Sequence, residues 1–320
     1  MRITIALLAA AMLAAPMTAP AAAQAEPHQH ESIRYASVKG CTIKGGGEVP
    51  CGHWRLVLHS GERRVLPDAQ VVARLANGKS AVYPPAPISV SGDGQKVAYL
   101  TRAGGLAVRT LDGDVKLLPA GALPRRDQEL IKLQLSGDGS RLAVGVSGDR
   151  YGTRVYDTAS GARLGSIAGP HQLAGFSGDS GELLTTLNGE EEVTDLAVNA
   201  DTGERLTRVT PPQIIVGNAP QALSGDGRTV AVLATGKSRL VLYDAQTDQL
   251  LKRQRVKLPA GEVHMLDWTG DRQVTVHLLR SVGKESRMVI AQMDTETGAV
   301  TIRDRYTLLK DTFVFASCGG

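Results

Sequence analysis

Short segments of alternating apolar and polar residues, separated by turns rich in Gly and Asp, run through most of the chain. Residues 95–100 and 228–232 are examples, and their length of five or six residues is that of a β-strand. Many short strands with turn signals between them are typical of an all-β domain. The hydrophobic pattern therefore predicts an all-β fold.

One phrase marks an internal repeat. A Ser-Gly-Asp turn follows an apolar strand and leads into a second strand at Ser91, Ser136, Ser177 and Ser224, and a Thr-Gly-Asp variant begins at Thr269. The spacings are 45, 41, 47 and 45 residues, which is the length of a propeller blade. The Asp side chain bonds local backbone and the following Gly accepts a positive φ. Each phrase therefore predicts a hairpin between the first and second strands of a blade.

A second turn follows downstream in every unit and predicts the hairpin between the third and fourth strands, so that each unit holds four antiparallel strands. The five turns span residues 108–114, 155–161, 198–203, 242–248 and 292–298.

The units resemble the bacterial secreted WD40-like repeats, whose blades carry an S-x-D-G turn and a later D-x-x-T-G turn. The resemblance covers about residues 86–306 and implies a β-propeller, but it implies nothing about chemistry. The Gly-His dipeptide of eukaryotic WD40 blades is absent from all five units. The Trp-Asp pair of those blades is represented only by Tyr156-Asp157 and Tyr243-Asp244. We therefore do not expect the hydrogen-bond tetrad of the eukaryotic WD40 family in this chain.

A sixth blade is predicted from the two ends of the chain. Ser317 lies 48 residues after Thr269, at the end of an apolar strand. Residues 33–38, 54–59 and 63–66 read as the three missing strands. A composite blade of one C-terminal and three N-terminal strands would close the ring and remove its unpaired edges. The alternative is seven blades, with another blade within 64–87.

The start of the chain reads as a secretory signal peptide over residues 1–25, with a charged beginning, an apolar run and a small-residue end. We therefore expect a secreted protein whose residues 26–320 form a single β-propeller domain, without an integral membrane segment. The 36 basic and 32 acidic residues nearly balance, and aromatic residues make up only 4%. These values argue against a nucleic-acid partner.

Three cysteines are present, and export permits disulfides. Cys41 and Cys51 flank a Gly-rich hairpin tip, so we predict a disulfide between them. Cys318 would then remain a thiol or pair with another molecule.

Several side chains are candidates for a site, and none carries a catalytic or metal-binding assignment. His171 and His264 each lie just before the predicted first strand of a blade, and Arg125 and Arg126 lie in an equivalent loop, so all four are candidate ligand-binding residues at the mouth of the channel. Surface histidines are the alternative interpretation. The phrase 178–181 matches a protease nucleophile box but lies in register with the other turns. The Asp of each turn is better explained by turn formation than by calcium binding.

The function predicted from the sequence is a non-catalytic extracytoplasmic interaction module, monomeric and without cofactors, that binds a protein or cell-surface ligand. One alternative is a propeller hydrolase or lactonase with a site at the channel mouth. Another is binding of an anionic cell-wall polymer through the basic residues Lys252, Arg253, Arg255 and Lys257. The favoured explanation of this run is that it falls on an outermost strand, where charge blunts the exposed edge.

Overall fold

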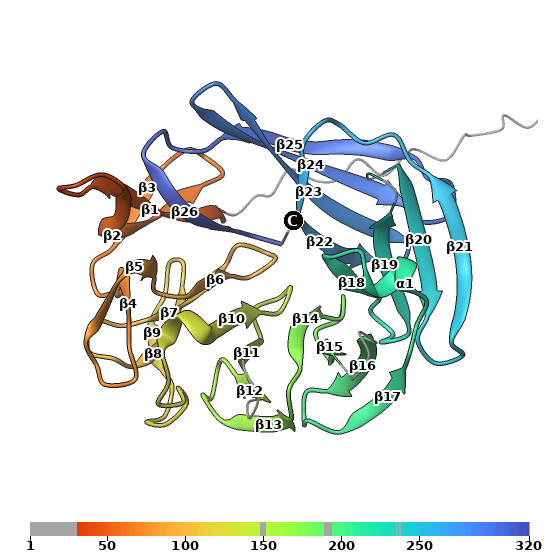
Figure 1. Ribbon diagram of the computed structural model, residues 1–320, viewed down its shortest axis with the longest axis horizontal. Helices are drawn as coiled ribbons and strands as arrows, with labels where there is room; N and C mark the ends of the chain where they lie inside the picture. The colour runs from red at the N-terminus through yellow and green to blue at the C-terminus, as the bar shows by residue number, and fades with distance from the viewer. Residues whose placement is uncertain (1–30, 148–151, 189–193, 235, 237, 320) are drawn as a thin grey trace, which may run out of the picture. The chain divides into compact units, whose positions relative to one another are not determined.

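The computed structural model describes residues 31–147, 152–188, 194–234, 236 and 238–319; the predicted signal peptide lies outside them. Six four-stranded antiparallel sheets stand around a central axis as the blades of a propeller (Figure 1). The predicted all-β, six-bladed architecture is therefore confirmed, including the composite blade that joins the two ends of the described chain.

Five blades are continuous in sequence, and each runs from an inner strand to an outer one. Their strands are β6 (Ile88–Val90), β7 (Lys96–Leu100), β8 (Leu106–Thr110) and β9 (Val115–Leu117); β10 (Ile131–Leu135), β11 (Arg141–Val146), β12 (Gly152–Asp157) and β13 (Arg163–Ala168); β14 (Gln172–Phe176), β15 (Glu182–Asn188), β16 (Thr194–Ala200) and β17 (Arg205–Val209); β18 (Gln221–Leu223), β19 (Thr229–Ala234), β20 (Arg239–Asp244) and β21 (Gln249–Arg255); and β22 (Glu262–Gly270), β23 (Gln273–Val282), β24 (Glu285–Asp294) and β25 (Val300–Thr307).

The sixth blade closes the ring with strands from both ends of the sequence. Its order is β26-β1-β2-β3, and β26 pairs antiparallel with β1 so that Tyr35 lies opposite Ser317 and Val38 opposite Val314. Pairing the two ends gives β1 an inner neighbour and makes β26 the innermost strand of this blade. The four strands are β26 (Thr312–Ser317), β1 (Ile33–Thr42), β2 (Glu48–Leu58) and β3 (Arg63–Leu66).

The segment 64–87 does not form a seventh blade. It contains a two-stranded hairpin, β4 (Val72–Arg74) and β5 (Ser80–Pro85). The side-chain oxygen of Gln128 accepts a hydrogen bond from the Arg74 backbone N–H, and Asp127 accepts one from Ala76. These bonds come from the short helix η1 (Gln128–Leu130) and its N-terminal neighbour, and they cover the edge of β4. The other helix is α1 (Gln213–Val216).

The repeated Ser-Gly-Asp phrase builds the same hydrogen-bonded turn in four blades. In the first, the Ser91 hydroxyl donates to Asp93 and accepts from the Lys96 backbone N–H, while Asp93 also accepts from the Gln95 N–H. The turns that begin at Ser136, Ser177 and Ser224 repeat all three bonds. The turn-forming role predicted for these Asp residues is thus what the structure shows.

At Gly92 the second residue of the phrase has to be Gly because this turn nearly touches the turn of the next blade. A Cβ on Gly92 would lie 2.9 Å from the Cα of Gly137, and one on Gly319 would lie 2.9 Å from the Cα of Gly92. The Asp93 N–H also donates to the Gly137 carbonyl at 2.8 Å. The backbones of successive turns are therefore in direct contact at this end of the blades.

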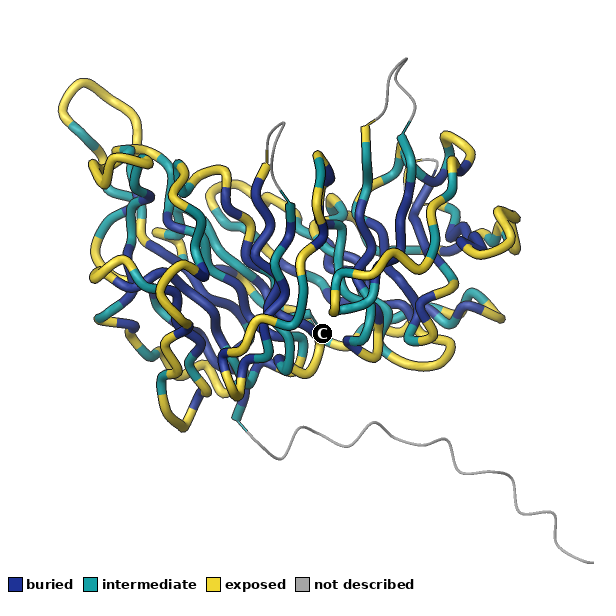
Figure 2. The backbone as a smooth tube through the Cα atoms, turned by 90° about the horizontal axis from the view of Figure 1, so that it is seen from below, coloured by how far each residue is buried: buried dark blue, intermediate teal, exposed yellow. Residues whose placement is uncertain are grey.

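The apolar core lies between the blades rather than in one central layer. Figure 2 shows the strands as mostly buried and the connecting loops as exposed. One cluster joins the closing blade to the first continuous blade through Trp54 and Tyr99, and another joins the last two continuous blades through Leu242 and Leu278. Each blade is therefore held by burial against its two neighbours.

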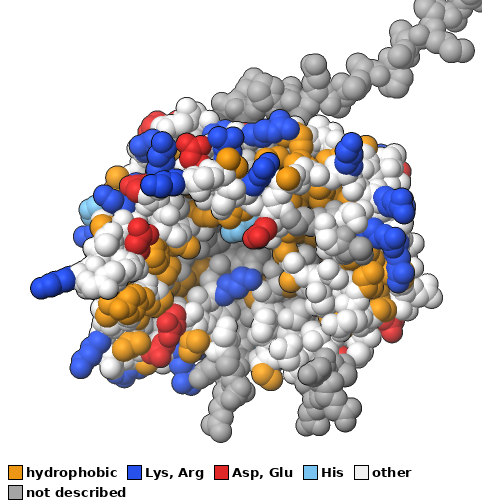
Figure 3. Space-filling model, turned by 45° about the horizontal axis from the view of Figure 1, so that its top comes forward, with side chains coloured by type: hydrophobic (Ala, Val, Ile, Leu, Met, Phe, Trp, Pro, Cys, Tyr) orange, Lys and Arg blue, Asp and Glu red, His pale blue; other side chains and the backbone are white. Residues whose placement is uncertain are grey.

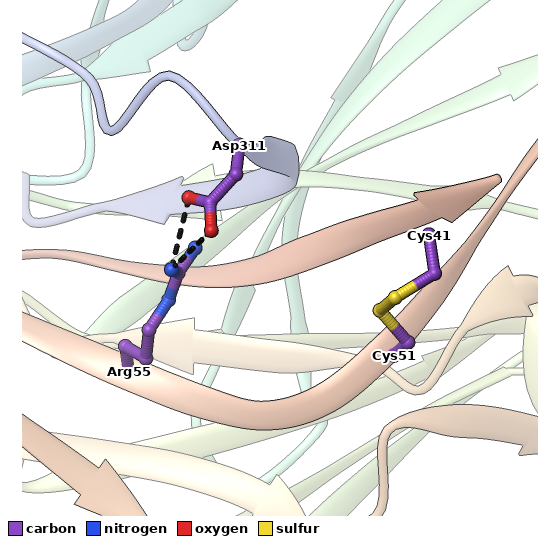
Figure 4. Close-up of a disulfide and its surroundings, with 4 residues drawn as sticks. All are labelled: Cys41, Cys51, Arg55 and Asp311. Atoms are coloured by element: carbon purple, nitrogen blue, oxygen red, sulfur yellow. Dashed lines mark hydrogen bonds and ion pairs between the residues drawn. A yellow bond between two sulfur atoms is a disulfide. The ribbon is translucent and has the colours of Figure 1, made fainter.

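The hairpin of β1 and β2 carries the predicted disulfide (Figure 4). Cys41 and Cys51 are joined, with their Cα atoms 5.9 Å apart. In the strand register Cys41 lies opposite Val49 and Cys51 opposite Lys39, so the bridge crosses the ladder diagonally. Arg55 of β2 forms a 2.9 Å ion pair with Asp311, just before β26. The bridge and this ion pair both fasten the closing blade.

Gly92→Ala and Gly137→Ala are matched substitutions at the same position of successive turns. We expect Gly92→Ala to lower the free energy of unfolding by about 1–3 kcal/mol, because the new methyl group would overlap backbone of the next blade. A Cβ on Gly137 meets nothing within 4 Å, so Gly137→Ala should be nearly neutral. Urea unfolding of both variants measures this, and equal losses would contradict the proposed close approach.

Thiol titration tests the cysteine arrangement. With Cys41 and Cys51 bridged and Cys318 buried as a thiol, we expect one reactive thiol per chain in denaturant and slow reaction in the native state. Three thiols in denaturant, without added reductant, would rule out the disulfide.

Candidate functional site

A pocket of about 550 Å³ lies at the turn end of three consecutive blades. It is lined by Gly178 and Asp179 from the β14–β15 turn, by residues 224–226 and Thr229 around the β18–β19 turn, and by Trp268, Gly270 and Asp271 at the end of β22. The repeat places these turns side by side, since each begins where an inner strand ends. The pocket is therefore a direct product of the repeat.

Asp179 and Asp226 each use one carboxylate oxygen to accept the hydrogen bonds of their turn. The Oδ1 atom of Asp179 accepts from the Ser177 hydroxyl at 2.7 Å and from the Gly181 N–H at 3.1 Å. Oδ1 of Asp226 is engaged in the same way by Ser224 and Arg228. Among the described residues no hydrogen bond reaches the second oxygen of Asp226, whereas the carboxyl groups of Asp179 and Glu182 lie within hydrogen-bonding distance of each other. Asp271 is exposed, so three carboxylates can face a ligand.

Glu182 adds a fourth carboxyl group at this end of the channel. The single proton of the Ser177 hydroxyl is shared between Oε2 of Glu182 at 2.8 Å and Oδ1 of Asp179 at 2.7 Å. Burial raises its pKa, and the negative charge of the nearby Asp179 acts in the same direction. The pocket therefore carries negative charge, and a positively charged group of a ligand would reduce the repulsion between the carboxyl groups of Glu182 and Asp179.

Trp268 gives the pocket an aromatic wall. It is the last residue before the Thr269 turn, and its half-buried side chain packs against the apolar cluster between the last two continuous blades. A Cβ on Gly178 would lie 2.9 Å from the Trp268 carbonyl oxygen and 3.5 Å from its Cδ1 atom. Glycine at 178 therefore allows the neighbouring turn to approach the indole.

A buried polar seam lies beside the pocket, between β22, β23 and the end of β26. The Oδ2 atom of Asp267 is buried, has no hydrogen-bond partner, and lies 3.7 Å from the position of a Cβ on Gly319. Burial raises the pKa of Asp267 to about 7. This carboxyl group is therefore largely protonated in weakly acidic solution.

His277 lies on β23 in the same seam and is fully buried. Its Nε2 atom is 3.1 Å from the Gly319 carbonyl oxygen, which can only accept, so Nε2 is the donor. Nδ1 is buried without a partner. Burial lowers the pKa of His277 to about 4, and the nearby His264 acts in the same direction. The imidazole is therefore neutral near neutral pH.

The two candidate histidines differ in position and surroundings. His171 directly precedes β14, as predicted, and is buried, with Nε2 3.3 Å from the Thr153 hydroxyl. Burial lowers its pKa, and Arg205 adds to the effect. His264, predicted just before its first strand, is instead the third residue of β22; it is exposed and stacks on Phe315 at 4.7 Å, and partial desolvation lowers its pKa. No described hydrogen bond or ring contact joins the two histidines.

Arg125 and Arg126 are exposed in the loop before η1 and β10. They lie in loops that lead into inner strands, whereas the pocket lies at the turns that follow inner strands. The four predicted residues and the pocket are therefore at opposite ends of the blades.

The protease-like phrase 178–181 forms a turn. Ser180 has a φ of 72°, a conformation that is usually adopted by Gly, and its hydroxyl donates to Asp138 of the preceding blade at 3.0 Å.

Sequence reasoning missed Trp268, Asp267 and His277. The repeat held a signal for two of them. The residue before each turn is Val90, Leu135, Phe176 or Leu223 in the other blades, so a Trp there departs from the pattern. An Asp one position earlier departs in the same way from Ser, Gln, Gly and Ala.

The described residues form neither a metal-binding cluster nor a membrane-spanning helix. They hold no group of three or more His, Cys, Asp or Glu side chains placed to bind a metal ion. Their helices include none that is both long and apolar enough to cross a lipid bilayer.

Comparison with known proteins shows likeness in fold alone. No family model and no curated protein matches the sequence. Among solved structures, the chain is similar to the β-propeller domain of Cps50 (Swd1) from Myceliophteria thermophila, with 15% identity, a TM-score of 0.43, and 69% and 70% of the two chains covered. It is also similar to hydrazine synthase of Kuenenia stuttgartiensis, with 16% identity, a TM-score of 0.43 and coverage of 68% and 65%. TolB from Acinetobacter baumannii shares 14% identity over 89% and 83% of the chains, again with a TM-score of 0.43.

The Asp267 carboxyl group makes stability depend on pH in a defined direction. The unfolded chain loses this proton near pH 4, whereas the folded protein keeps it to about pH 7. The stabilisation is complete below pH 4 and is lost as the pH rises through 7. His277 acts in the opposite sense: its contribution is present above about pH 6.5 and is lost as the pH falls towards 4.

We therefore expect Asp267→Asn to stabilise the protein at pH 8 by about 2–4 kcal/mol relative to its effect at pH 4. Urea unfolding at pH 4, 6 and 8 measures the difference. Asp271→Asn, an exposed carboxylate four residues away, is the control and should show no such trend. A gain for Asp267→Asn that is the same at pH 4 and pH 8 would contradict the assignment.

Proposed function

We propose that this protein is a non-catalytic, extracytoplasmic interaction module, a WD40-like propeller that binds a basic segment of a partner protein in the turn-end pocket. One observation carries the proposal: Asp179, Asp226, Asp271 and Trp268 line the same pocket. The three carboxylates can accept hydrogen bonds from an ammonium or guanidinium group. An indole face attracts the same cation.

The physical chemistry favours a Lys or Arg side chain over a free metal ion. Calcium needs about six or more converging oxygens, whereas an alkylammonium or guanidinium group needs a few acceptors and an apolar wall for its stem. The half-buried Trp268 supplies that wall. A cation over the ring of Trp268 would contribute about 0.5–2 kcal/mol, and the charge-assisted hydrogen bonds that it donates to the carboxylates would add to this.

Fluorescence titration tests this function. The chain has two tryptophans, and Trp54 is buried with its Nε1 bonded to the Gln70 carbonyl oxygen, so Trp268 should report a ligand in the pocket. We expect a tri-arginine or tri-lysine peptide to change the emission saturably. A tri-glutamate peptide should have no effect.

The double substitution Asp179→Asn and Asp226→Asn should weaken binding of the basic peptide at least tenfold. The pair Asp93→Asn and Asp114→Asn is the control, because Asp93 makes the same turn bonds in a blade outside the pocket and Asp114 is an exposed carboxylate of that blade, so the same charge is removed. Equal weakening in both double variants would mean that only turn stability or net charge is involved, and the pocket would not be the binding site.

A further inference from the structure

One lysine lies among the inner strands of the propeller, far from any carboxylate on those strands. The inner strands are β6, β10, β14, β18, β22 and β26, and Lys132 of β10 is the single Lys or Arg on them. Their two carboxylates, Glu262 and Asp267, both lie on β22, three blades away around the ring. Figure 3 shows a hollow near the centre of the propeller, with Lys or Arg side-chain atoms in it.

The amine of Lys132 is held against the next blade. Its Nζ atom donates to the Leu173 carbonyl oxygen of β14 at 2.7 Å. This backbone carbonyl is its one partner within the described residues, where no carboxylate forms an ion pair with Lys132. The hydrogen bond therefore fixes the position of the nitrogen without supplying a counter-charge.

The face of the blade that carries Lys132 has small and uncharged neighbours. Directly opposed residues share a face, and Lys132 lies opposite Gly145, which lies opposite Thr153. A Cβ on Gly145 would be 3.6 Å from the Leu173 Cβ, so this face is turned towards β14. Gln134, two residues along β10, lies on the same face, and its Oε1 atom is buried without a hydrogen-bond partner among the described residues. None of these side chains brings a negative charge to the amine.

Solvent reaches Lys132 although protein surrounds most of its side chain. The residue is exposed, so a small molecule can approach the amine. Burial among the blades lowers the pKa of Lys132, and no neighbouring charge contributes to the shift. His171, just before β14, is uncharged near neutral pH because burial lowers its pKa as well. More of Lys132 than of an ordinary lysine is therefore the neutral amine, which is the nucleophilic form.

We propose that Lys132 is a covalent binding site for a small aldehyde, which its Nζ atom takes up as an imine. The neutral amine attacks the carbonyl carbon and forms the C–N bond. The carbonyl oxygen then leaves as water with the two amine protons, and the C=N bond remains, so the step needs neither an oxidant nor a reductant. When the imine nitrogen is protonated, its N–H can donate to the Leu173 carbonyl oxygen as the amine does.

Reductive trapping with acetaldehyde and cyanoborohydride tests this site. The native protein is treated at pH 7, and the ethylated lysines are identified by mass spectrometry of its peptides. We expect Lys132 to react at least threefold faster than Lys44 and Lys79, which are exposed in the β1–β2 and β4–β5 hairpins, because the neutral fraction of an amine rises about tenfold for each unit by which its pKa falls. In concentrated urea the three rates should become equal, since the surroundings of Lys132 are lost.

The variant Gln134→Glu separates a reactive amine from one that is merely accessible. The new carboxylate lies on the same face as Lys132 and favours the ammonium form, so the rate at Lys132 should fall to that of Lys44 or below. Gln246→Glu is the control, because it adds the same charge at an exposed position two blades away and should change the rate less than twofold.

Two results would overturn the proposal. One is a rate at Lys132 of the native protein that is no higher than the rates at Lys44 and Lys79. The other is equal slowing in Gln134→Glu and Gln246→Glu. Neither Lys132 nor Gln134 lines the turn-end pocket, so this proposal and the proposed function can fail separately.

Discussion

The pairing of β26 with β1 is the interaction on which the rest of the propeller depends. Each blade is stabilised by burial against two neighbours, so an open ring would leave two blades with an uncovered face. Five residue pairs of β1 and β26 close it, and the packing of Tyr35 against Tyr306 and Phe315 joins the closing blade to the last continuous one. Arg34 contributes to the same joint through an ion pair of 3.0 Å with Asp304.

Closure of the ring also determines the surroundings of two titratable groups, Asp267 and His277. It brings Gly319 to within contact of Gly92, on the first continuous blade, and of the Asp267 and His277 side chains on the last one. Two titratable groups thereby become buried where the ring is joined. Both groups are uncharged between about pH 4 and 7. Over that range no free energy is lost to the burial of a charge in the seam.

The repeat made most of the fold predictable. Ser317 falls in register with the five earlier turns, and that position alone identifies the last strand as the first strand of a sixth blade. The hairpin over 72–85 was less accessible, because its Pro-rich sequence gives no strand periodicity and its edge is held by Gln128, a residue far away in sequence. The disulfide was predictable because only one pair of cysteines flanks a hairpin.

The candidate sites were less predictable, for a physical reason. A turn Asp looks the same in every blade, and whether its second oxygen faces a pocket depends on the neighbouring blades. Asp93 and Asp226 make the same turn bonds, yet only Asp226 shares a pocket with Trp268. His277 carries no local signal either, since it sits within an ordinary strand and becomes buried only through the approach of Gly319.

Departures from the repeat are therefore more informative than the repeat itself. Among the continuous blades, that of β22 to β25 has the longest strands, with β23 and β24 spanning ten residues each. It supplies Trp268 to the pocket and Asp267 and His277 to the seam. One of its two neighbours is the closing blade, and the approach of Gly319 from that blade is what encloses the Asp267 and His277 side chains in the seam.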